Sequence, residues 1–203
     1  MSLPRFTPAG LCLILALASQ PLLATSVEPP AFTSLVSQAD YVVRGVVTAI
    51  EPEWREAAGK PFIASKVTVE VREIIRGNPP SPLVLDMVGG KIGDVELSVD
   101  GAPKFNVGDE DILFIKDNGK TFSPLVAVMY GRFPILRDAK TGETFAVRSN
   151  GMPLYSEQDV AEPMTRLSAF KQRRTAAKPL TAAAFASKIR ETSARNPGVS
   201  HAK

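Results

Sequence analysis

Residues Tyr41–Ile50, YVVRGVVTAI, determine how the chain is expected to fold. The run is apolar and rich in β-branched side chains, which is typical of a largely buried strand. Gly45 lies in its middle. A glycine inside a strand marks a bulge or a sharp bend, as at the corner of a barrel. We therefore expect a long strand that bends near Gly45.

The next strand carries a second bend. In Ser65–Gly77, SKVTVEVREIIRG, valines alternate with other residues up to Val71, and the phase then changes at Ile74 and Ile75. A slip of one residue in a period of two suggests a bulge. Two long, bent strands are what a small barrel needs to close. The segment between them, Glu51–Phe62, is polar and is predicted to be a hairpin loop.

Shorter apolar runs bounded by turn residues predict the remaining strands. These are LVLDMV at 83–88, the alternating segment at 94–100, DILFI at 111–115, and one or two strands, broken at Gly131, in LVAVMYGRFPIL at 125–136. The sequence DAKTG at 138–142 predicts a tight hairpin turn before ETFAVR at 143–148.

Helical patterns flank the strands. Residues 32–39 place apolar side chains on one face of a short helix. Downstream, AEPMTRLSAFKQRR at 161–174 and KPLTAAAFASKIRET at 178–192 predict two C-terminal helices, and Thr181 is a suitable N-cap for the second. The predicted organisation is a β-barrel domain over 31–158, a helical extension over 159–196 and a disordered tail over 197–203.

Residues 1–24 have the layout of a secretory signal peptide. Arg5 precedes the apolar run Leu11–Ala18, which is shorter than the roughly 20 residues of a stable bilayer span. We prefer cleavage after Ala24, with cleavage after Ala18 as the alternative site. The alternative to a cleaved signal peptide is an uncleaved membrane anchor. Cys12 is the only cysteine, so the mature chain would have no thiol. We therefore expect a periplasmic or secreted bacterial protein, with no stable transmembrane segment once the signal is cleaved.

Charge is divided unevenly along the chain. The net formal charge is +3, but residues 161–203 hold nine Lys or Arg and two Glu, which gives +7. With Arg5 in the leader, residues 25–160 carry −5. We favour a basic helical tail that lies on an acidic body, because no run of five like charges occurs. A tail that binds an anionic surface is the alternative.

Residues Asp86–Ile115 combine glycines with carboxylates in a way that first suggests a ligand site. GGKIGDV at 89–95 lacks the Ser or Thr and the following helix of a phosphate loop. Acids alternate along Asp94–Asp100, but apolar residues alternate between them, so we predict a half-buried strand. A calcium site on Asp109, Glu110 and Asp111 remains an alternative. The favoured interpretation of the whole stretch is strands and turns.

The sequence assigns no catalytic residue, no cofactor and no metal ligand. His201, near the C-terminus, is the only histidine, so a nucleophile with a histidine base is not indicated. The Cys and His spacings of a zinc site are missing too. Asp86 shares a strand face with Val84 and Val88. A satisfied structural carboxylate is favoured there over a site residue, because buried charges are usually paired.

The order of these segments resembles a known module. The segments are ADYVVRGVV at 39–47, VTVEVREIIRG at 67–77, FNVGDEDILFI at 105–115 and GRFPI at 131–135. They resemble the OB-like barrel of netrin-type modules and tissue inhibitors of metalloproteinases, and uncharacterised exported bacterial proteins with this layout. The resemblance covers about residues 32–136. It implies a mainly β fold, a small OB-like antiparallel β-barrel with a short N-terminal helix and two C-terminal helices.

The resemblance does not extend to mechanism. The metalloproteinase inhibitors act through an N-terminal cysteine, and this chain has none at that place. OB-type nucleic-acid binders stack bases on exposed aromatic side chains along a basic groove. Here the body is acidic, and Tyr41, Phe114 and Phe133 are predicted to be core residues. We therefore expect no nucleic-acid partner.

A non-enzymatic binding module is the function that the sequence favours, with a protein partner in the cell envelope or outside the cell. Trp54 and Phe62 in the predicted hairpin loop are the candidate partner-binding residues, because exposed aromatic side chains often anchor interfaces. A lid over the barrel end is an equal alternative for Trp54. The other functions considered are a carboxylate-dependent envelope hydrolase and a structural protein whose basic tail lies on an anionic surface.

Overall fold

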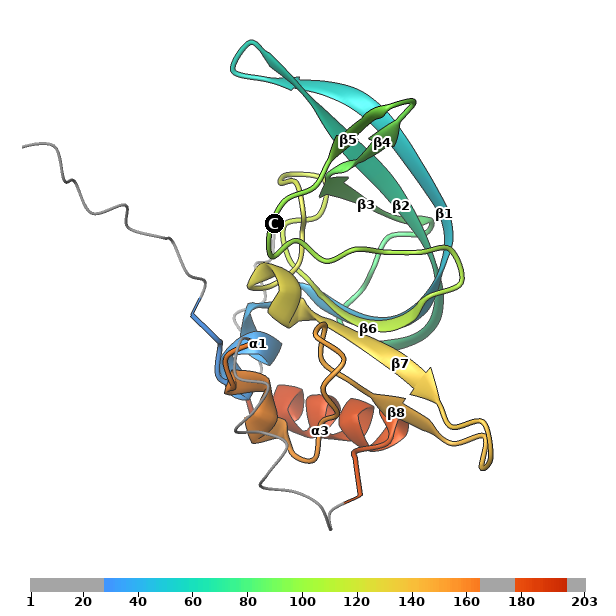
Figure 1. The fold of residues 1–203 in the computed structure, drawn as a ribbon. Coiled ribbons are helices and arrows are strands. Elements are labelled where there is room, and N and C mark those ends of the chain that lie inside the picture. Colours follow the sequence, from blue (N-terminus) through green and yellow to red (C-terminus); the bar gives the residue numbers. More distant parts are fainter. Residues whose placement is uncertain (1–27, 165–177, 197–203) are drawn as a thin grey trace, which may run out of the picture.

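A curved antiparallel sheet dominates the computed structural model, which describes residues 28–164 and 178–196 (Figure 1). Within these ranges the sheet has six strands in the order β3-β2-β1-β6-β7-β8, and a separate pair is formed by β4 and β5. The strands are β1 (Tyr41–Ala57), β2 (Lys60–Arg76), β3 (Leu83–Val88), β4 (Gly90–Ile92), β5 (Val95–Leu97), β6 (Glu110–Ile115), β7 (Arg132–Arg137) and β8 (Thr144–Ala146). The mainly β prediction is confirmed.

The two long strands bend where the sequence predicts. The pairing of β1 with β2 shifts register between Arg44 and Gly45, and a further shift leaves Ile75 without a partner across from Val42 and Val43. A Cβ on Gly45 would lie 2.5 Å from Val69 Cγ1, so only glycine lets the strands approach there. These bulges curl the sheet around an apolar interior.

The strands do not close into a barrel, and that prediction is wrong. Among the described residues β3 and β6 do not pair with each other, and residues 116–126 lie between them instead. In this segment the Ser123 N–H donates to the Asp86 carbonyl at 2.7 Å, and the Val126 N–H donates to the Phe114 carbonyl at 2.9 Å. Ser123 has a φ of 55°, which interrupts an extended conformation and prevents a closing strand.

The middle of the sheet separates two apolar cores. The concave side of the sheet encloses Val43, Val47, Val67, Val69, Leu83, Leu85, Leu113 and neighbouring residues. The other side of β1, β6 and β7 packs against the helices α1 (Phe32–Gln38) and α3 (Ala182–Arg195) (Figure 1). Because β6 is covered on both faces, its sequence is continuously apolar from Ile112 to Ile115.

Helix positions agree with the prediction in part. The N-terminal helix α1 and the C-terminal helix α3 are confirmed, and the Thr181 hydroxyl caps α3 by accepting from the Ala184 N–H. The other C-terminal helix does not begin at Ala161, because Glu157–Ala161 forms the 3₁₀ helix η4. Three predictions fall outside the described residues: the remainder of that helix from residue 165, the predicted signal peptide over 1–24 with Cys12, and the predicted tail over 197–203 with His201.

One predicted strand is corrected and another is confirmed in part. Only Val95–Leu97 of the segment 94–100 is a strand, and Val95 is 51% exposed, so the segment is not a half-buried strand. In the apolar segment 125–136, the break expected at Gly131 is present, because β7 begins at Arg132, and Val128–Gly131 form the 3₁₀ helix η3 instead of a first strand. Positive φ values at Ala127 and Val128 account for this turn.

The C-terminal segment 178–196 carries basic residues that pair with the acidic body. Lys188 lies 2.9 Å from Glu157, Lys178 lies 2.9 Å from Glu143, and Arg190 contacts Glu73. The Lys188 ammonium lowers the pKa of Glu157 below its ordinary value. In this part of the chain, the favoured interpretation of the charge asymmetry therefore agrees with the structure.

Candidate functional site

The β1–β2 hairpin is longer than the sequence predicts. Strand pairing continues through the polar segment Glu51–Phe62 as far as Ala57 and Lys60, so the loop prediction is wrong. Ala58 and Gly59, both with positive φ, make a two-residue turn whose twist matches that of the flanking strands. The end of this ribbon projects beyond the rest of the sheet (Figure 1).

Trp54 and Phe62 lie on opposite faces of this ribbon. Trp54 is opposite Ile63 in the register, whereas Phe62 is opposite Arg55, and cross-strand partners share a face. Trp54 is 52% exposed. Phe62 is half-buried and packs edge to face on Phe122, with the ring centroids 5.1 Å apart. The two predicted residues therefore do not form one patch, and Trp54 is the exposed one.

The concave face that carries Trp54 also carries a cavity. Ile50, Ser65 and Val67 alternate with the same phase as Trp54 and its partner Ile63, and they form part of the cavity wall. The cavity has a volume of about 390 Å³. Its other walls come from the end of β3, from β4 and β5, and from the loop that follows them, so it lies within the stretch of glycines and carboxylates singled out in the sequence.

Two adjacent glycines let the chain cross the concave face beside this cavity. The Ser65 hydroxyl donates to the Gly89 carbonyl at 2.7 Å. Gly90 has a φ of 144°, and a Cβ there would lie 2.4 Å from Ser65 Oγ and 3.2 Å from Ile63 and Pro52. These glycines therefore serve close packing of β4 over the ribbon, which supports the prediction of strands and turns over a phosphate cradle.

We expect Gly90→Ala to destabilise the protein by roughly 1–3 kcal/mol, because the new methyl group meets packed atoms at a strained φ. Gly93→Ala is the matched control. Gly93 lies in the turn of the same hairpin with a φ of 58° and nothing near its Cβ position. Urea unfolding followed by circular dichroism measures both variants. Equal losses for the two variants would contradict close packing at Gly90.

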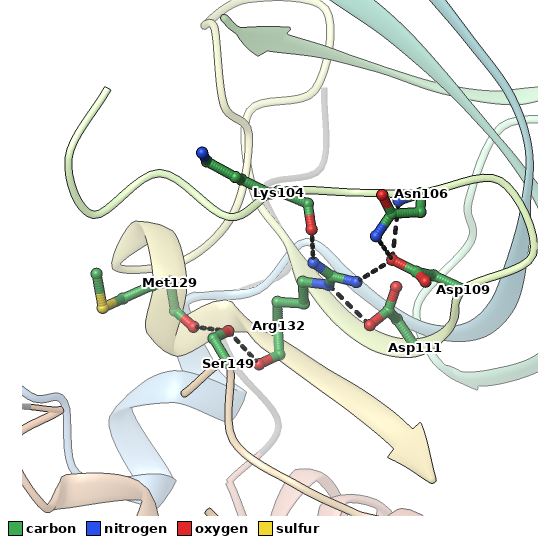
Figure 2. A network of polar contacts seen from close by, with 7 residues as sticks. All are labelled: Lys104, Asn106, Asp109, Asp111, Met129, Arg132 and Ser149. Carbon is green, nitrogen blue, oxygen red and sulfur yellow. Dashed lines mark hydrogen bonds and ion pairs between the residues drawn. The ribbon is translucent and has the colours of Figure 1, made fainter. Parts of the chain in front are cut away.

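A buried arginine contacts the loop that forms one wall of the cavity, and Figure 2 shows its polar contacts. Arg132 donates from Nε to Asp111 at 2.8 Å and from a terminal nitrogen to Asp109 at 2.7 Å. It also donates to the carbonyl of Lys104, and its guanidinium carbon lies 4.3 Å from the centre of the Phe105 ring. Lys104 and Phe105 line the cavity. The network therefore fixes the backbone of that wall to β6 and β7.

Burial shapes the electrostatics of this network. Asp111 is fully buried, and its Oδ2 has no hydrogen-bond partner. Burial raises the pKa of Asp111 above its ordinary value, although the Arg132 guanidinium acts in the opposite direction. Because every nitrogen of Arg132 already donates to an oxygen of the chain, the arginine is a positioning group and is not free to bind a ligand.

The three adjacent acids considered for calcium do not converge on one point. Asp109 and Asp111 both bind Arg132, whereas Glu110 binds Arg44 at 2.7 Å. Within the described residues, no group of three or more Asp, Glu, His or Cys side chains is arranged to hold a metal ion. The geometry therefore assigns these carboxylates to arginine pairing.

Asp86 lies in an ion cluster on the convex face. It shares that face with Val84 and Val88, as predicted, and its Oδ1 lies 3.6 Å from Arg55. Arg55 also binds Glu53 at 2.6 Å, and Lys66 lies 3.3 Å from the same carboxylate. Desolvation acts to raise the pKa of Glu53, but Lys66 and Arg55 outweigh it and lower the pKa below its ordinary value. The pairing agrees with a structural role for Asp86, but its Oδ1 is buried and accepts no hydrogen bond, so the carboxylate is only partly satisfied.

Sequence reasoning missed two features of the site. The cavity lysines Lys91 and Lys104 stand in turns and short strands, where no periodic pattern distinguishes them from ordinary surface residues. Arg132 follows Gly131 in a segment interpreted as an apolar strand. A charged residue inside such a segment is a signal for a buried ion pair, and the acids at Asp109 and Asp111 were the available partners.

Comparison with known proteins adds no assignment, because neither a family model nor a curated protein matches the chain. Within the described ranges, no helix combines the length and the apolar character that crossing a membrane requires.

Proposed function

We propose that this chain is an exported, non-enzymatic binding module that holds a protein partner in the cell envelope or outside the cell, with Trp54 as its main anchor. The observation that carries the proposal is the position of Trp54, a large aromatic side chain that is 52% exposed on a projecting ribbon. Tryptophan is enriched among residues that dominate interface energetics. Phe62 contributes from the opposite face of the ribbon, where its contact with Phe122 braces the hairpin.

The distribution of charges favours a binding module over the alternatives. Asp86, Glu53, Asp109 and Asp111 are each engaged by a basic side chain, whereas a hydrolase would need a pair of acids open to a substrate. Asp86 does not line the cavity, where the carboxylate is that of Glu96. The basic residues of α3 are paired within the chain, which weakens the proposal of a tail on an anionic surface.

We expect Trp54→Ala to weaken binding of the partner by at least about thirtyfold, the loss that a hot-spot residue of roughly 2 kcal/mol produces. The stability of the fold should change by less than about 1 kcal/mol, since the side chain is half exposed. Quantitative mass spectrometry of proteins that co-purify with the tagged full chain from its native envelope identifies the partner. Titration with that protein then measures the affinity.

Leu136→Ala is the matched control, because Leu136 is 53% exposed but lies on β7, away from the hairpin. A partner that is retained by Leu136→Ala and lost by Trp54→Ala would support the proposal. A partner that binds both variants as tightly as the unmodified chain would remove Trp54 from the interface, and the absence of any partner would count against the binding module itself.

A further inference from the structure

We propose that the concave cavity is a second binding site, for a small amphiphile that consists of an apolar chain with a monoanionic carboxylate head group. The inference rests on the cavity and its lining and does not depend on Trp54 or on a protein partner. It assigns a ligand class to a part of the molecule that the proposed function leaves unused.

The size and the lining of the cavity fit a single apolar chain. Its volume of about 390 Å³ is near the lower end of the ~300–1,000 Å³ that small-molecule sites occupy. About half of its wall is apolar, from residues on the sheet and on the loop facing it: Ile50, Val67, Met87, Leu97, Val99, Ala102, Pro103 and Phe105. An apolar chain that entered would exchange water for these side chains, which is favourable in proportion to the area removed from water.

The charged residues of the lining favour an anion. Lys91, Lys104 and Glu96 together give the lining a charge of +1, whereas the body of the chain is acidic. Neither Lys91 nor Lys104 forms an ion pair with any described residue. In Figure 2 the Lys104 side chain points away from Arg132, while only its carbonyl faces the guanidinium. A lysine is protonated at neutral pH, so its ammonium can pair with a carboxylate.

The cavity is preorganised on two sides. On one side, the crossing at Gly89 and Gly90 is fixed by the Ser65 hydroxyl. On the other, Arg132 stacks on Phe105 and ties the neighbouring backbone to Asp109 and Asp111. Because these walls are already fixed in the absence of a ligand, less conformational entropy is lost when a ligand binds. This distinguishes the cavity from a gap that side-chain motion would fill.

Isothermal titration of the purified full chain with dodecanoate, below its micelle-forming concentration, tests the proposal. We expect saturable binding of one molecule per chain, weaker at high salt because the charges are at an exposed rim. Dodecanol lacks the charge and should bind at least about tenfold more weakly, the effect of losing one charge-assisted contact. Dodecyltrimethylammonium, which is repelled by the lysines, should bind more weakly still. Dodecyl phosphate distinguishes a site for any anionic head group from a site for a carboxylate. If it bound more tightly than dodecanoate, the carboxylate assignment would be overturned.

Variants locate the site. Ala102→Phe places a ring in the cavity and should abolish binding, and Val99→Phe does the same from a side chain that is already 41% exposed and so cannot disturb the core. Lys104→Met should weaken binding about tenfold. Lys60→Met, at the exposed hairpin turn outside the cavity, is the matched control and should have no effect.

Each outcome decides one part of the inference. Absence of dodecanoate binding by the unmodified chain would overturn it entirely. Unchanged binding by both filling variants would place the ligand elsewhere. A third outcome is that the filling variants abolish binding, whereas Lys104→Met and Lys91→Met leave it unchanged. The cavity would then be an apolar binding site, and the assignment of an anionic head group would be overturned.

Discussion

Replacing Arg132 by methionine is expected to lower the free energy of unfolding by roughly 3–5 kcal/mol. The side chain of Arg132 is 8% exposed, and that of its partner Asp111 is 1% exposed. Methionine fills most of the volume but leaves the Asp111 carboxylate buried without its counter-charge, which costs far more than the loss of a surface pair. Urea unfolding followed by circular dichroism measures the change.

The neighbouring pair of Arg44 and Glu110 provides the matched control. The side chains of this pair are 22% and 25% exposed, and the shortest distance between its nitrogen and oxygen atoms is 2.7 Å. The pair therefore has a geometry similar to that of Arg132 and Asp111, but it is much less buried. We expect Arg44→Met to cost at most about 1 kcal/mol. If Arg132→Met cost no more than Arg44→Met, the network in Figure 2 would not be what fixes the cavity wall.

Phe185→Ala is expected to destabilise the protein by roughly 3–5 kcal/mol, because truncation of a fully buried phenylalanine leaves a cavity in the core. The ring of Phe185 joins α3 to the sheet and to α1. Its centroid lies 4.9 Å from that of Phe133, 5.8 Å from Phe32 and 6.3 Å from Phe114. The same unfolding experiment applies.

Ser187→Ala, on the exposed side of the same helix, controls for a general effect of substitution in α3 and should stay within about 0.5 kcal/mol. A loss below about 1 kcal/mol for Phe185→Ala would mean that α3 is not docked on the sheet. The helix would then be free to carry its basic residues to an anionic surface.

The parts of the fold that were predictable are those where burial imposes a period. The bends near Gly45 and at Ile74 and Ile75 could be found because a bulge shifts the phase of a strand that has one buried face. The helix α3 could be found because Thr181 caps an apolar face that is complementary to the sheet.

The missed parts lack such a period. The end of the β1–β2 hairpin has both faces in solvent, so its strands carry polar residues and look like a loop. In the segment Val95–Val99 the alternation is present, but its apolar residues face the cavity and solvent, and periodicity alone cannot distinguish these from a core. The prediction of a closed barrel failed for a third reason. The residue with a positive φ at that place is Ser123 and not a glycine, so the sequence gives no sign of the interruption.

The candidate site was predictable only in its aromatic part. Trp54 was identified because a lone tryptophan in a polar segment is conspicuous. The cavity could not be identified, because it is assembled from residues between Ile50 and Asn106 that come together only when β4 crosses the ribbon at Gly90. The pairing of Arg132 with two acids more than 20 positions earlier likewise depends on the register of β6 and β7.

Photo-crosslinking from position 54 tests the central claim most directly. A benzophenone amino acid replaces Trp54 in the full chain, expressed in its native cell, and a second protein carries the same group at Leu136, which is equally exposed. The binding-module account predicts a discrete protein crosslinked from position 54 and absent from position 136. No crosslinked protein from position 54, or the same set of proteins from both positions, would contradict it.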